Sequence, residues 1–502
     1  MEPYLTLFGH VITLSTRPTP SFLEYHIRPM AAQDTPSPGM MLAVELGVDG
    51  DLMAYAMVRV SNAWEANPYE DAHSATLEEV MPFNLVSPSE GESPVIYRVC
   101  HVEPLEMALV RPDTGELVDV RSVTRLPRAG APVYLPWGDL IARTLGLIDD
   151  RTRALDLGTI RGSEEVAALI RRDAIQRHMS ILGAIGSGKS YTRGVIAEEL
   201  TRLRVPQVNI DVNGEMISAA KELGGRTVVP GKDFHVPLSA FTAGDILNAV
   251  PSLGGNMVEL VRHAHEELLG DARATRGTFG VEELINRMNE EAPRLDMKPV
   301  TLRPAVARVG SLRRMPILGA PFDWKSELTP GAFINIDCRG RSLTELRLIA
   351  ASVARDIQRL GQSGAVPFIA LSVDEAHLVA PSDDETVAKQ VFRELARIGR
   401  HIRVGLIITT QAPRDIDSSI LERTLTRFIH TLEPHQLPGI RSLFADASED
   451  LIKQMPKMPV GVCVVTGAIE NIRHAAVVKV RSRRTTHGGE TPDIWKDLDE
   501  QP

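Results

Sequence analysis

The chain has 502 residues, of which 43% are hydrophobic and 24% charged, a composition typical of a globular protein and inconsistent with wholesale disorder. The sequence has no apolar run of about 18 residues, no basic leader before an apolar stretch and no paired cysteines. We therefore expect a cytoplasmic protein without membrane spans, disulfides or zinc sites. The net charge is −10, with −12 in residues 1–150 and +2 in the remainder, so bulk charge does not favour a nucleic-acid protein.

Residues 1–150 contain short apolar segments separated by Pro, Gly and Asp. These segments predict a small β-barrel or sandwich, with strands at 42–46, 52–60, 95–99 and 133–135. The polar, acidic stretch 61–90 is predicted to be a surface excursion from this domain.

Residues 151–484 form a second predicted domain. From about residue 178, continuous apolar segments alternate with amphipathic ones, a pattern that predicts an α/β fold with a parallel sheet covered on both faces. The expected strands are 179–183, 208–211, 333–337, 368–374, 405–410, 428–432 and 460–465. Residues 240–330 read as a helical insertion, and 485–502 as a polar C-terminal tail that folds against a partner subunit.

The clearest motif is a glycine-rich loop between a predicted strand and a predicted helix at 191–203. It fits the phosphate-loop pattern G-x-x-x-x-G-K-[ST] at every position. Glycines allow close approach to oxygen atoms, and the backbone N–H groups at the helix start attract phosphate. Lys189 is expected to reach the β- and γ-phosphates of ATP, and Ser190 to bind Mg²⁺. The loop consists of Gly183, Ala184, Ile185, Gly186, Ser187, Gly188, Lys189 and Ser190.

Two carboxylates follow the strand predicted at 368–374. Asp374 is suited to Mg²⁺, and Glu375 to accepting a proton from the water that attacks the γ-phosphate. The sequence Asp374-Glu375-Ala376-His377 also invites a DEAH-box helicase interpretation, which we discount because no arginine-rich helicase motif follows.

Further polar residues lie at the ends of other predicted strands. Gln411 is expected beside the γ-phosphate, or alternatively as a simple strand cap. Arg400 and Arg177 are candidates for stabilising the transferred phosphoryl group, or else surface charges. Asp211 and Glu215 could hold Mg²⁺-bound water, pair with an arginine of the next subunit, or simply belong to a turn built on Asn213-Gly214.

Together these motifs resemble the HerA family, hexameric DNA translocases of the HerA–FtsK group of P-loop ATPases. The resemblance spans about residues 170–490. It implies a RecA-like core, a small N-terminal barrel of the type called the HAS barrel, and a ring of six subunits that moves along double-stranded DNA. It also implies a partner, typically the nuclease NurA, or a Sir2-like protein or another effector in defence systems. The matching segments are Arg177-His178, 183–190, 211–215, 374–377, Gly399-Arg400, 410–413, 478–481 and 485–489.

The function expected from the sequence is therefore an ATP-dependent DNA translocase that works with a nuclease or a defence effector. The alternative is a regulatory ATPase scaffold that assembles and activates an effector without moving DNA. A conjugation-type pump would need a membrane anchor, which the sequence does not predict.

Overall fold

In the computed structural model of the chain, the described residues are 6–13, 20–30, 36–66, 97–250, 252–275, 277–444, 447, 449–467 and 472–488. The contacts divide the chain into two compact units. Phe428–Arg481 groups with Met1–Arg172 in one unit, and Asp173–Arg427 forms the other unit together with Ser482–Pro502. The predicted domains were 1–150 and 151–484. The contacts instead group residues 151–172 and Phe428–Arg481 with the N-terminal part.

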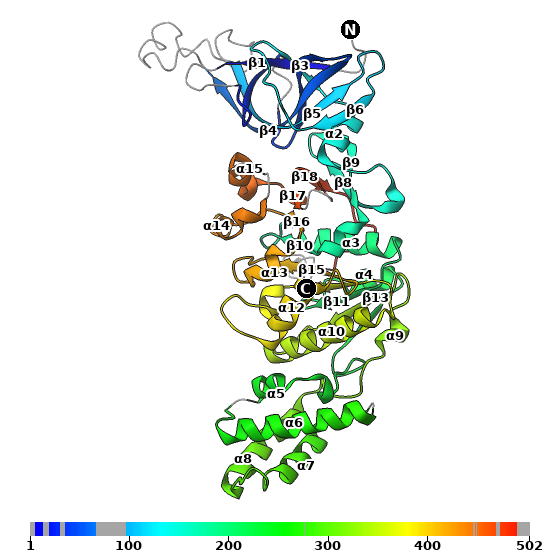
Figure 1. Cartoon of the computed structure of the whole chain (residues 1–502), viewed down its shortest axis with the longest axis vertical. Helices are drawn as coiled ribbons and strands as arrows, with labels where there is room; N and C mark the ends of the chain where they lie inside the picture. The colour runs from blue at the N-terminus through cyan, green and yellow to red at the C-terminus, as the bar shows by residue number, and fades with distance from the viewer. Residues whose placement is uncertain are drawn as a thin grey trace, which may run out of the picture. The chain divides into compact units, whose positions relative to one another are not determined.

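The first unit begins with an antiparallel sheet in the order β2-β1-β7-β3-β4-β5-β6, drawn in blue and cyan in Figure 1. Since β2 also pairs with β5, the six strands from β2 to β5 close on themselves. Alternate residues such as Leu42, Val44, Val58 and Val60 point into a shared core, the pattern expected when one face of each strand is buried. The strands are β1 (Thr6–Ile12), β2 (Tyr25–Pro29), β3 (Met41–Asp49), β4 (Leu52–Ala66), β5 (Tyr97–Val110), β6 (Leu117–Arg121) and β7 (Pro132–Leu135).

Strand β4 is longer than predicted. Residues 61–66, expected to begin the acidic excursion, pair with β5 through contacts such as Trp64 with Val99. Residues 67–90 of that predicted excursion lie outside the described residues.

The same unit contains a second antiparallel region, in the strand order β17-β18-β8-β9. The strand predicted at 460–465 is present as β17, and it pairs with β18 in the antiparallel orientation, so the sheet is mixed and not parallel throughout. The short connection from β17 to β18 explains the difference, because parallel pairing needs a crossover of a dozen or more residues. The elements are α2 (Gly138–Leu145), β8 (Ala154–Ile160), β9 (Ser163–Arg171), α14 (Leu437–Ile440), α15 (Glu449–Gln454), β17 (Val462–Gly467) and β18 (Ala476–Val480).

The second unit is built on buried parallel strands in the order β12-β13-β11-β14-β15-β10. Helix α3 lies on one side of these strands, and α10 and α12 pack together on the other (Figure 1). The predicted strands in this unit are present, and β12 is an addition. The strands are β10 (Met179–Leu182), β11 (Gln207–Asp211), β12 (Arg226–Val228), β13 (Phe333–Asp337), β14 (Ile369–Val373), β15 (Val404–Thr410) and, at the boundary of the units, β16 (Thr426–Ile429).

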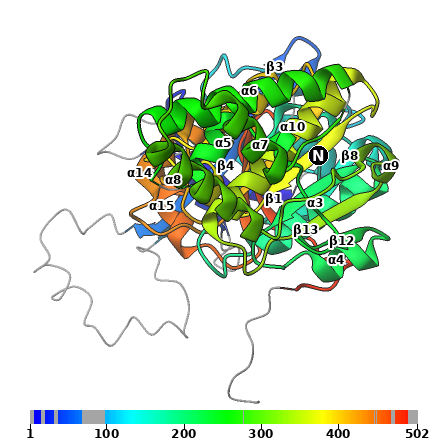
Figure 2. The same cartoon turned by 90° about the horizontal axis from the view of Figure 1, so that it is seen from below.

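Between β12 and β13 the chain is helical, and α5 to α8 pack against one another (Figures 1 and 2). Capping boxes at Thr242 and Ser342 mark the starts of α5 and α10, as expected where a side chain satisfies the first free N–H groups. The helices are α3 (Lys189–Arg202), α4 (Ile217–Glu222), α5 (Ala243–Ala249), α6 (Asn256–Thr275), α7 (Val281–Glu291), α8 (Pro299–Gly310), α9 (Trp324–Glu327), α10 (Leu343–Ser363), α11 (Ala376–Val379), α12 (Val387–Ile398) and α13 (Ser418–Glu422).

The cysteines and the longest apolar helices bear on the expectations about disulfides and membrane spans. Cys100, Cys338 and Cys463 are buried free thiols. In the described part of the chain, no helix is both long and apolar enough to cross a membrane.

Candidate active site

Four segments that the sequence singled out meet at one edge of the parallel sheet. Strands β10, β11, β14 and β15 run in the same direction, so their carboxyl ends lie together. The segments that follow these ends are the glycine-rich loop 183–190, the Asp211–Glu215 turn, Asp374-Glu375 and Gln411. The N–H of Gly183 also donates to the carbonyl of Thr410, at 3.4 Å, which ties the start of the loop to the strand before Gln411.

The loop 183–190 has the backbone that close contact with phosphate requires. Gly186 and Gly188 have φ values of 74° and 105°, a conformation that favours glycine, and a Cβ at Gly186 would meet open space. Helix α3 begins at Lys189, whose Nζ donates to the carbonyl of Ala184 at 3.0 Å. Burial lowers the pKa of Lys189, while the charges of Glu375 and Asp374 oppose that shift.

Glu375 has the chemistry of a proton acceptor that works near neutral pH. Its backbone is left-handed, with φ of 44°, and burial together with the adjacent charge of Asp374 raises its pKa to about 7. The backbone N–H of Gln411 donates to its carboxylate, and Nδ1 of His377 lies 3.4 Å from Oε2. A base whose pKa lies near the working pH is the most effective proton acceptor.

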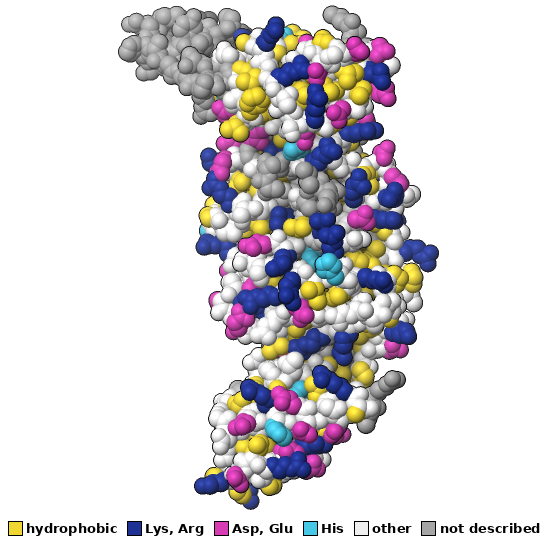
Figure 3. All heavy atoms as spheres, in the orientation of Figure 1, with side chains coloured by type: hydrophobic (Ala, Val, Ile, Leu, Met, Phe, Trp, Pro, Cys, Tyr) yellow, Lys and Arg dark blue, Asp and Glu magenta, His cyan; other side chains and the backbone are white. Residues whose placement is uncertain are grey.

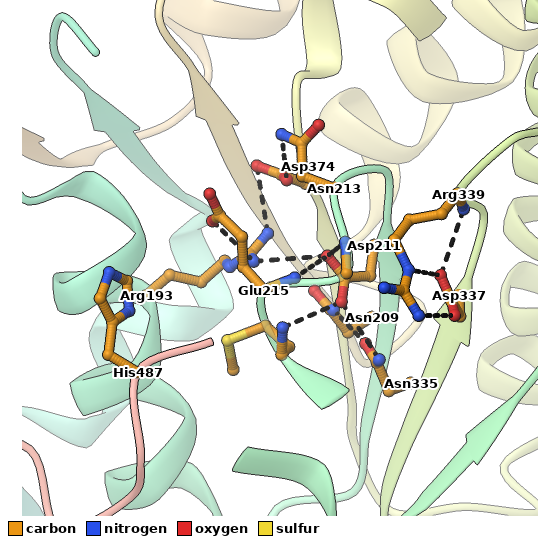
Figure 4. A network of polar contacts seen from close by, with 12 residues as sticks. Arg193, Asn209, Asp211, Asn213, Glu215, Asn335, Asp337, Arg339, Asp374 and His487 are labelled. Carbon is orange, nitrogen blue, oxygen red and sulfur yellow. Dashed lines mark hydrogen bonds and ion pairs between the residues drawn. The ribbon is translucent and has the colours of Figure 1, made fainter. Parts of the chain in front are cut away.

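The buried carboxylates surround a cation that the sequence analysis did not single out. Nη1 of Arg193, on α3, lies 3.1 Å from Oδ1 of Asp374, and Nη2 lies 3.6 Å from Asp211 and 3.5 Å from Glu215 (Figure 4). Asp211 also accepts hydrogen bonds from three backbone N–H groups of its own turn, those of Gly214, Glu215 and Met216. The Asp211–Glu215 segment forms a turn, and within the chain it pairs with Arg193.

The two predicted arginines are not at this edge. Arg177 immediately precedes β10, and Arg400 lies between α12 and β15. Because β10 and β15 are parallel, both arginines lie at the amino edge of the sheet, opposite the glycine-rich loop.

His178 follows Arg177 in the chain and contacts the segment that carries Arg400. Its Nδ1 accepts from the N–H of Leu406 at 3.0 Å, and its ring packs so closely on Gly399 that a Cβ there would come within 2.7 Å of it. Burial lowers its pKa to about 4, so the ring is neutral at pH 7. His178 therefore fixes the backbone beside both Arg177 and Arg400.

The C-terminal segment 482–488 packs on α3 of its own chain. It includes the start of the tail predicted at 485–502 to fold against a partner subunit, and residues 489–502 of that tail lie outside the described residues. The Glu198 carboxylate accepts hydrogen bonds from the N–H groups of Arg484 and Thr485 and from the Thr485 hydroxyl, at 2.8–2.9 Å. The N–H of Arg483 donates to the Tyr191 hydroxyl at 2.7 Å, and Gly488 lies against the backbone of Glu215. We call 482–488 the C-terminal strap.

The oxygen atoms at the site fit Mg²⁺ held jointly with a nucleotide. Ser190 and Asp374 offer a hydroxyl and a carboxylate, both hard ligands, and Mg²⁺ in nucleotide sites takes only one or two ligands from the protein and others from phosphate. Among the described residues, no group of three His, Cys, Asp or Glu side chains could hold a metal alone. When bound, Mg²⁺ would neutralise part of the negative charge of the phosphates.

The chain is similar to known proteins over much of its length. Residues 155–357 match the family model described as the central domain of helicase HerA. A probable helicase of Methanocaldococcus jannaschii is 25% identical over 398 residues, covering 74% of this chain and 75% of that protein. The DNA double-strand break repair helicase HerA of Sulfurisphaera tokodaii is 24% identical over 401 residues, covering 75% and 78%. VirB4 of Thermoanaerobacter pseudethanolicus has a similar fold, with a TM-score of 0.54 at 16% identity over 67% of this chain and 99% of that one.

A phosphate loop at the carboxyl edge of a parallel sheet, facing a buried Asp-Glu pair, defines a P-loop ATPase, an enzyme that hydrolyses ATP. In particular, residues 155–357 match the model of the HerA central domain, so the resemblance to the HerA family is confirmed.

Proposed function

We propose that the protein is an ATP-driven motor that forms a ring of six subunits and moves along double-stranded DNA. The observation that carries this proposal is the division of the predicted catalytic residues between two opposite edges of one sheet. In a head-to-tail ring, the amino edge of one subunit faces the carboxyl edge of the next. Arg177 or Arg400 would then complete a neighbour's site, as arginines supplied in trans do in other phosphoryl-transfer enzymes.

Within one subunit, each predicted residue has a role in this proposal. The loop 183–190 binds the phosphates of ATP, and Ser190 and Asp374 hold Mg²⁺. Glu375 accepts the proton of the attacking water, and Gln411 orients that water. Asp211 and Glu215 act through Arg193, which they hold beside Asp374.

The closed N-terminal sheet is the second part of the proposal. We assign it as a HAS barrel that docks an effector, either a nuclease of the NurA type or another effector such as a Sir2-like protein. Its composition supports a partner other than DNA, because residues 1–150 carry a net charge of −12. Negative charge repels phosphates and attracts basic protein surfaces.

The alternative is a regulatory scaffold whose ATP hydrolysis times the assembly of an effector. It is supported by the surface in Figure 3, where Lys and Arg side chains are mixed with Asp and Glu side chains instead of forming one basic patch for DNA. Steady-state ATPase assays with and without linear duplex DNA separate the two functions. A motor is stimulated several-fold by duplex DNA, whereas stimulation by the effector alone would support the scaffold and overturn the motor.

Assembly is tested by multi-angle light scattering and by electron microscopy of the full chain with a non-hydrolysable ATP analogue. The expected result is a six-membered ring. A monomer that hydrolyses ATP at the full rate would overturn the shared-site proposal.

A further inference from the structure

Thr410, at the end of β15, contacts three parts of the active site at once. Its carbonyl accepts a hydrogen bond from the N–H of Gly183 at 3.4 Å, at the start of the glycine-rich loop. Its side-chain Oγ1 accepts from the N–H of Ala412 at 3.1 Å, just beyond Gln411, and lies 3.0 Å from Nδ1 of His377. Because the Thr410 side chain is fully buried, water cannot replace any of these partners.

The contact between His377 and Thr410 joins α11 to β15. His377 is two residues after Glu375, in the first turn of α11. The backbone of Glu375 has φ of 44°, a left-handed conformation that costs energy for a residue with a Cβ. Such a conformation persists only where the surrounding structure holds it. The contact with Thr410 is a restraint of this kind, because it anchors the first turn of α11 on the neighbouring strand.

The hydrogen bond between these two side chains has a defined direction. Burial lowers the pKa of His377, so its ring is neutral at pH 7 and one ring nitrogen is an acceptor. Since Oγ1 of Thr410 already accepts from Ala412 and a buried hydroxyl donor is rarely left unused, we assign the hydroxyl as the donor to Nδ1. Nδ1 then has no proton to offer Oε2 of Glu375, 3.4 Å away. Consistently, no described residue donates a hydrogen bond to Oε2.

The end of β15 thus holds Glu375 by two routes. The backbone N–H of Gln411 donates directly to the carboxylate of Glu375. The side chain of Thr410 holds His377, which fixes the turn on which Glu375 stands. Because the two routes start from adjacent residues of one strand, Glu375 and Gln411 keep a constant spacing.

We propose that His377 and Thr410 are positioning residues of the ATPase, whose mutual hydrogen bond fixes Glu375 relative to Gln411. Loss of this bond misplaces the carboxylate and slows hydrolysis of bound ATP, whereas binding of ATP, which depends on the loop 183–190, is unchanged. The inference rests on the proposed role of Glu375 as the proton acceptor and not on movement along DNA.

The first test replaces Thr410 by Val, which keeps the shape of the side chain and removes the hydroxyl. Single-turnover hydrolysis of ATP by the full chain with Mg²⁺ measures the chemical step, and the Kd of a non-hydrolysable ATP analogue measures binding. Thr410→Val should lower the hydrolysis rate by about 10-fold or more, a loss expected when a catalytic group is misplaced by a fraction of an ångström, and leave the Kd unchanged. Thr410→Ser keeps the hydroxyl and should recover most of the rate.

Thr409→Val is the matched control in the same strand. The Thr409 side chain is also buried, but its Oγ1 makes no hydrogen bond to any described residue. The hydrolysis rate and the Kd should therefore stay at their wild-type values. A loss of hydrolysis in Thr409→Val as large as that in Thr410→Val would trace the effect to the strand and not to the hydrogen bond, and would overturn the proposal.

The second test replaces the other partner. His377→Leu removes the acceptor, whereas His377→Asn places an amide oxygen near the position of Nδ1. His377→Leu should lose about as much hydrolysis as Thr410→Val, and His377→Asn should recover part of it. In the double variant of Thr410→Val and His377→Leu, the rate should be no lower than in the slower single variant, because both substitutions remove the same bond.

Wild-type hydrolysis in Thr410→Val, equal losses in Thr410→Ser and Thr410→Val, or a Kd that weakens as much as the rate falls would overturn the proposal. If Thr410→Val does not fold, the two His377 variants decide the question. A slower rate in His377→Leu that His377→Asn partly restores supports the proposal, and equal rates in the two overturn it. Glu375→Gln is measured in parallel, since full hydrolysis in that variant would overturn the role of Glu375 itself, whereas a failure confined to Thr410 and His377 overturns only their positioning role.

Discussion

Gly194 of α3 lies directly beneath the guanidinium of Arg483, so close that a Cβ at position 194 would overlap it. Glycine in a helix interior costs about 1 kcal/mol relative to alanine. At position 194 the missing Cβ leaves room for the Arg483 guanidinium on the surface of the helix. The guanidinium faces the Tyr191 ring at 5.9 Å and donates hydrogen bonds to Thr485 Oγ1. The helix that carries the phosphate loop is thus shaped to receive the C-terminal strap.

Gly194→Ala should therefore destabilise the protein, against the usual preference for alanine in helices. The methyl group displaces the Arg483 guanidinium from its contacts, at a cost of about 1–2 kcal/mol. After the gain in helix propensity, the net loss is up to about 1 kcal/mol. In an Arg483→Ala background, the same substitution should stabilise by up to about 1 kcal/mol. Denaturant unfolding of the four proteins measures this change of sign. Equal effects of Gly194→Ala in both backgrounds would show that the strap does not rest on α3 in solution.

The pH dependence of ATP turnover should reveal Glu375. A general base acts only when deprotonated, and the pKa of Glu375 is about 7. We expect kcat/KM for ATP to rise with pH, with a midpoint near pH 7, and then to level off, because kcat/KM reports ionisation of the nucleotide-free enzyme. A kcat/KM that is already maximal at pH 5.5 would exclude Glu375 as the base.

The same pKa predicts a change in stability for Glu375→Gln. The folded-state pKa is above the unfolded value of 4.5, so folding favours the protonated acid. The penalty for ionisation is absent below about pH 4.5, grows as pH rises to 7 and is complete above it, where it is on the order of 3 kcal/mol. Glu375→Gln removes this penalty and should therefore gain stability over the wild type between pH 5 and pH 8. A stability difference that does not vary with pH would contradict the raised pKa.

Local pattern was sufficient to predict the parallel strands and the phosphate loop. Continuous apolar segments identified the strands, and β10 followed by Gly183 and Lys189 is a short-range signal contained within a dozen residues. The direction of β17 could not be predicted in this way, because an apolar segment of that length has the same composition in a parallel or an antiparallel pair. Its pairing depends on β18 and on the length of the connection.

Arg193 and the C-terminal strap were missed for a different reason. Arg193 is 181 residues from Asp374 in the sequence, and a single arginine in a helix ordinarily points to solvent. Its spacing of four residues from Lys189 was the one available signal, since it places both cations on the same face of α3. Nothing local indicates that Thr485 will be buried against Glu198, because that contact is set by the whole fold.

Lys189→Ala tests the phosphate loop directly. Loss of a cation that contacts the β- and γ-phosphates should lower turnover by at least about 10²-fold, in the range found when one transition-state donor is removed. The Tm of the nucleotide-free protein should change little, because Nζ makes a single hydrogen bond to a loop carbonyl and the cost of burying its charge offsets its attraction to Glu375 and Asp374. Lys221→Ala, an exposed lysine on α4, is the control. Wild-type turnover at saturating ATP would remove the phosphate-loop assignment.

The position of Arg177 and Arg400 at the amino edge predicts that each acts on a neighbouring subunit or not at all. Replacing the arginine that acts in trans by Ala should lower kcat by about 10³-fold or more while changing ATP affinity little, because such a cation stabilises the transition state more than the ground state. Arg397→Ala, an exposed arginine on α12, should retain wild-type kcat.

Mixed rings distinguish action in trans from a structural effect. Arg400→Ala and Lys189→Ala subunits are each expected to be inactive alone. When they are mixed, some boundaries join an intact phosphate loop from the first variant to an intact Arg400 from the second, and part of the activity should return. The same mixture with Arg177→Ala tests the other candidate. If neither mixture recovers hydrolysis although both variants assemble with Lys189→Ala subunits, then neither arginine completes the site of a neighbour. If both single variants keep normal turnover, the transition-state charge is stabilised within one subunit, where Lys189 and Arg193 are the cations beside Asp374.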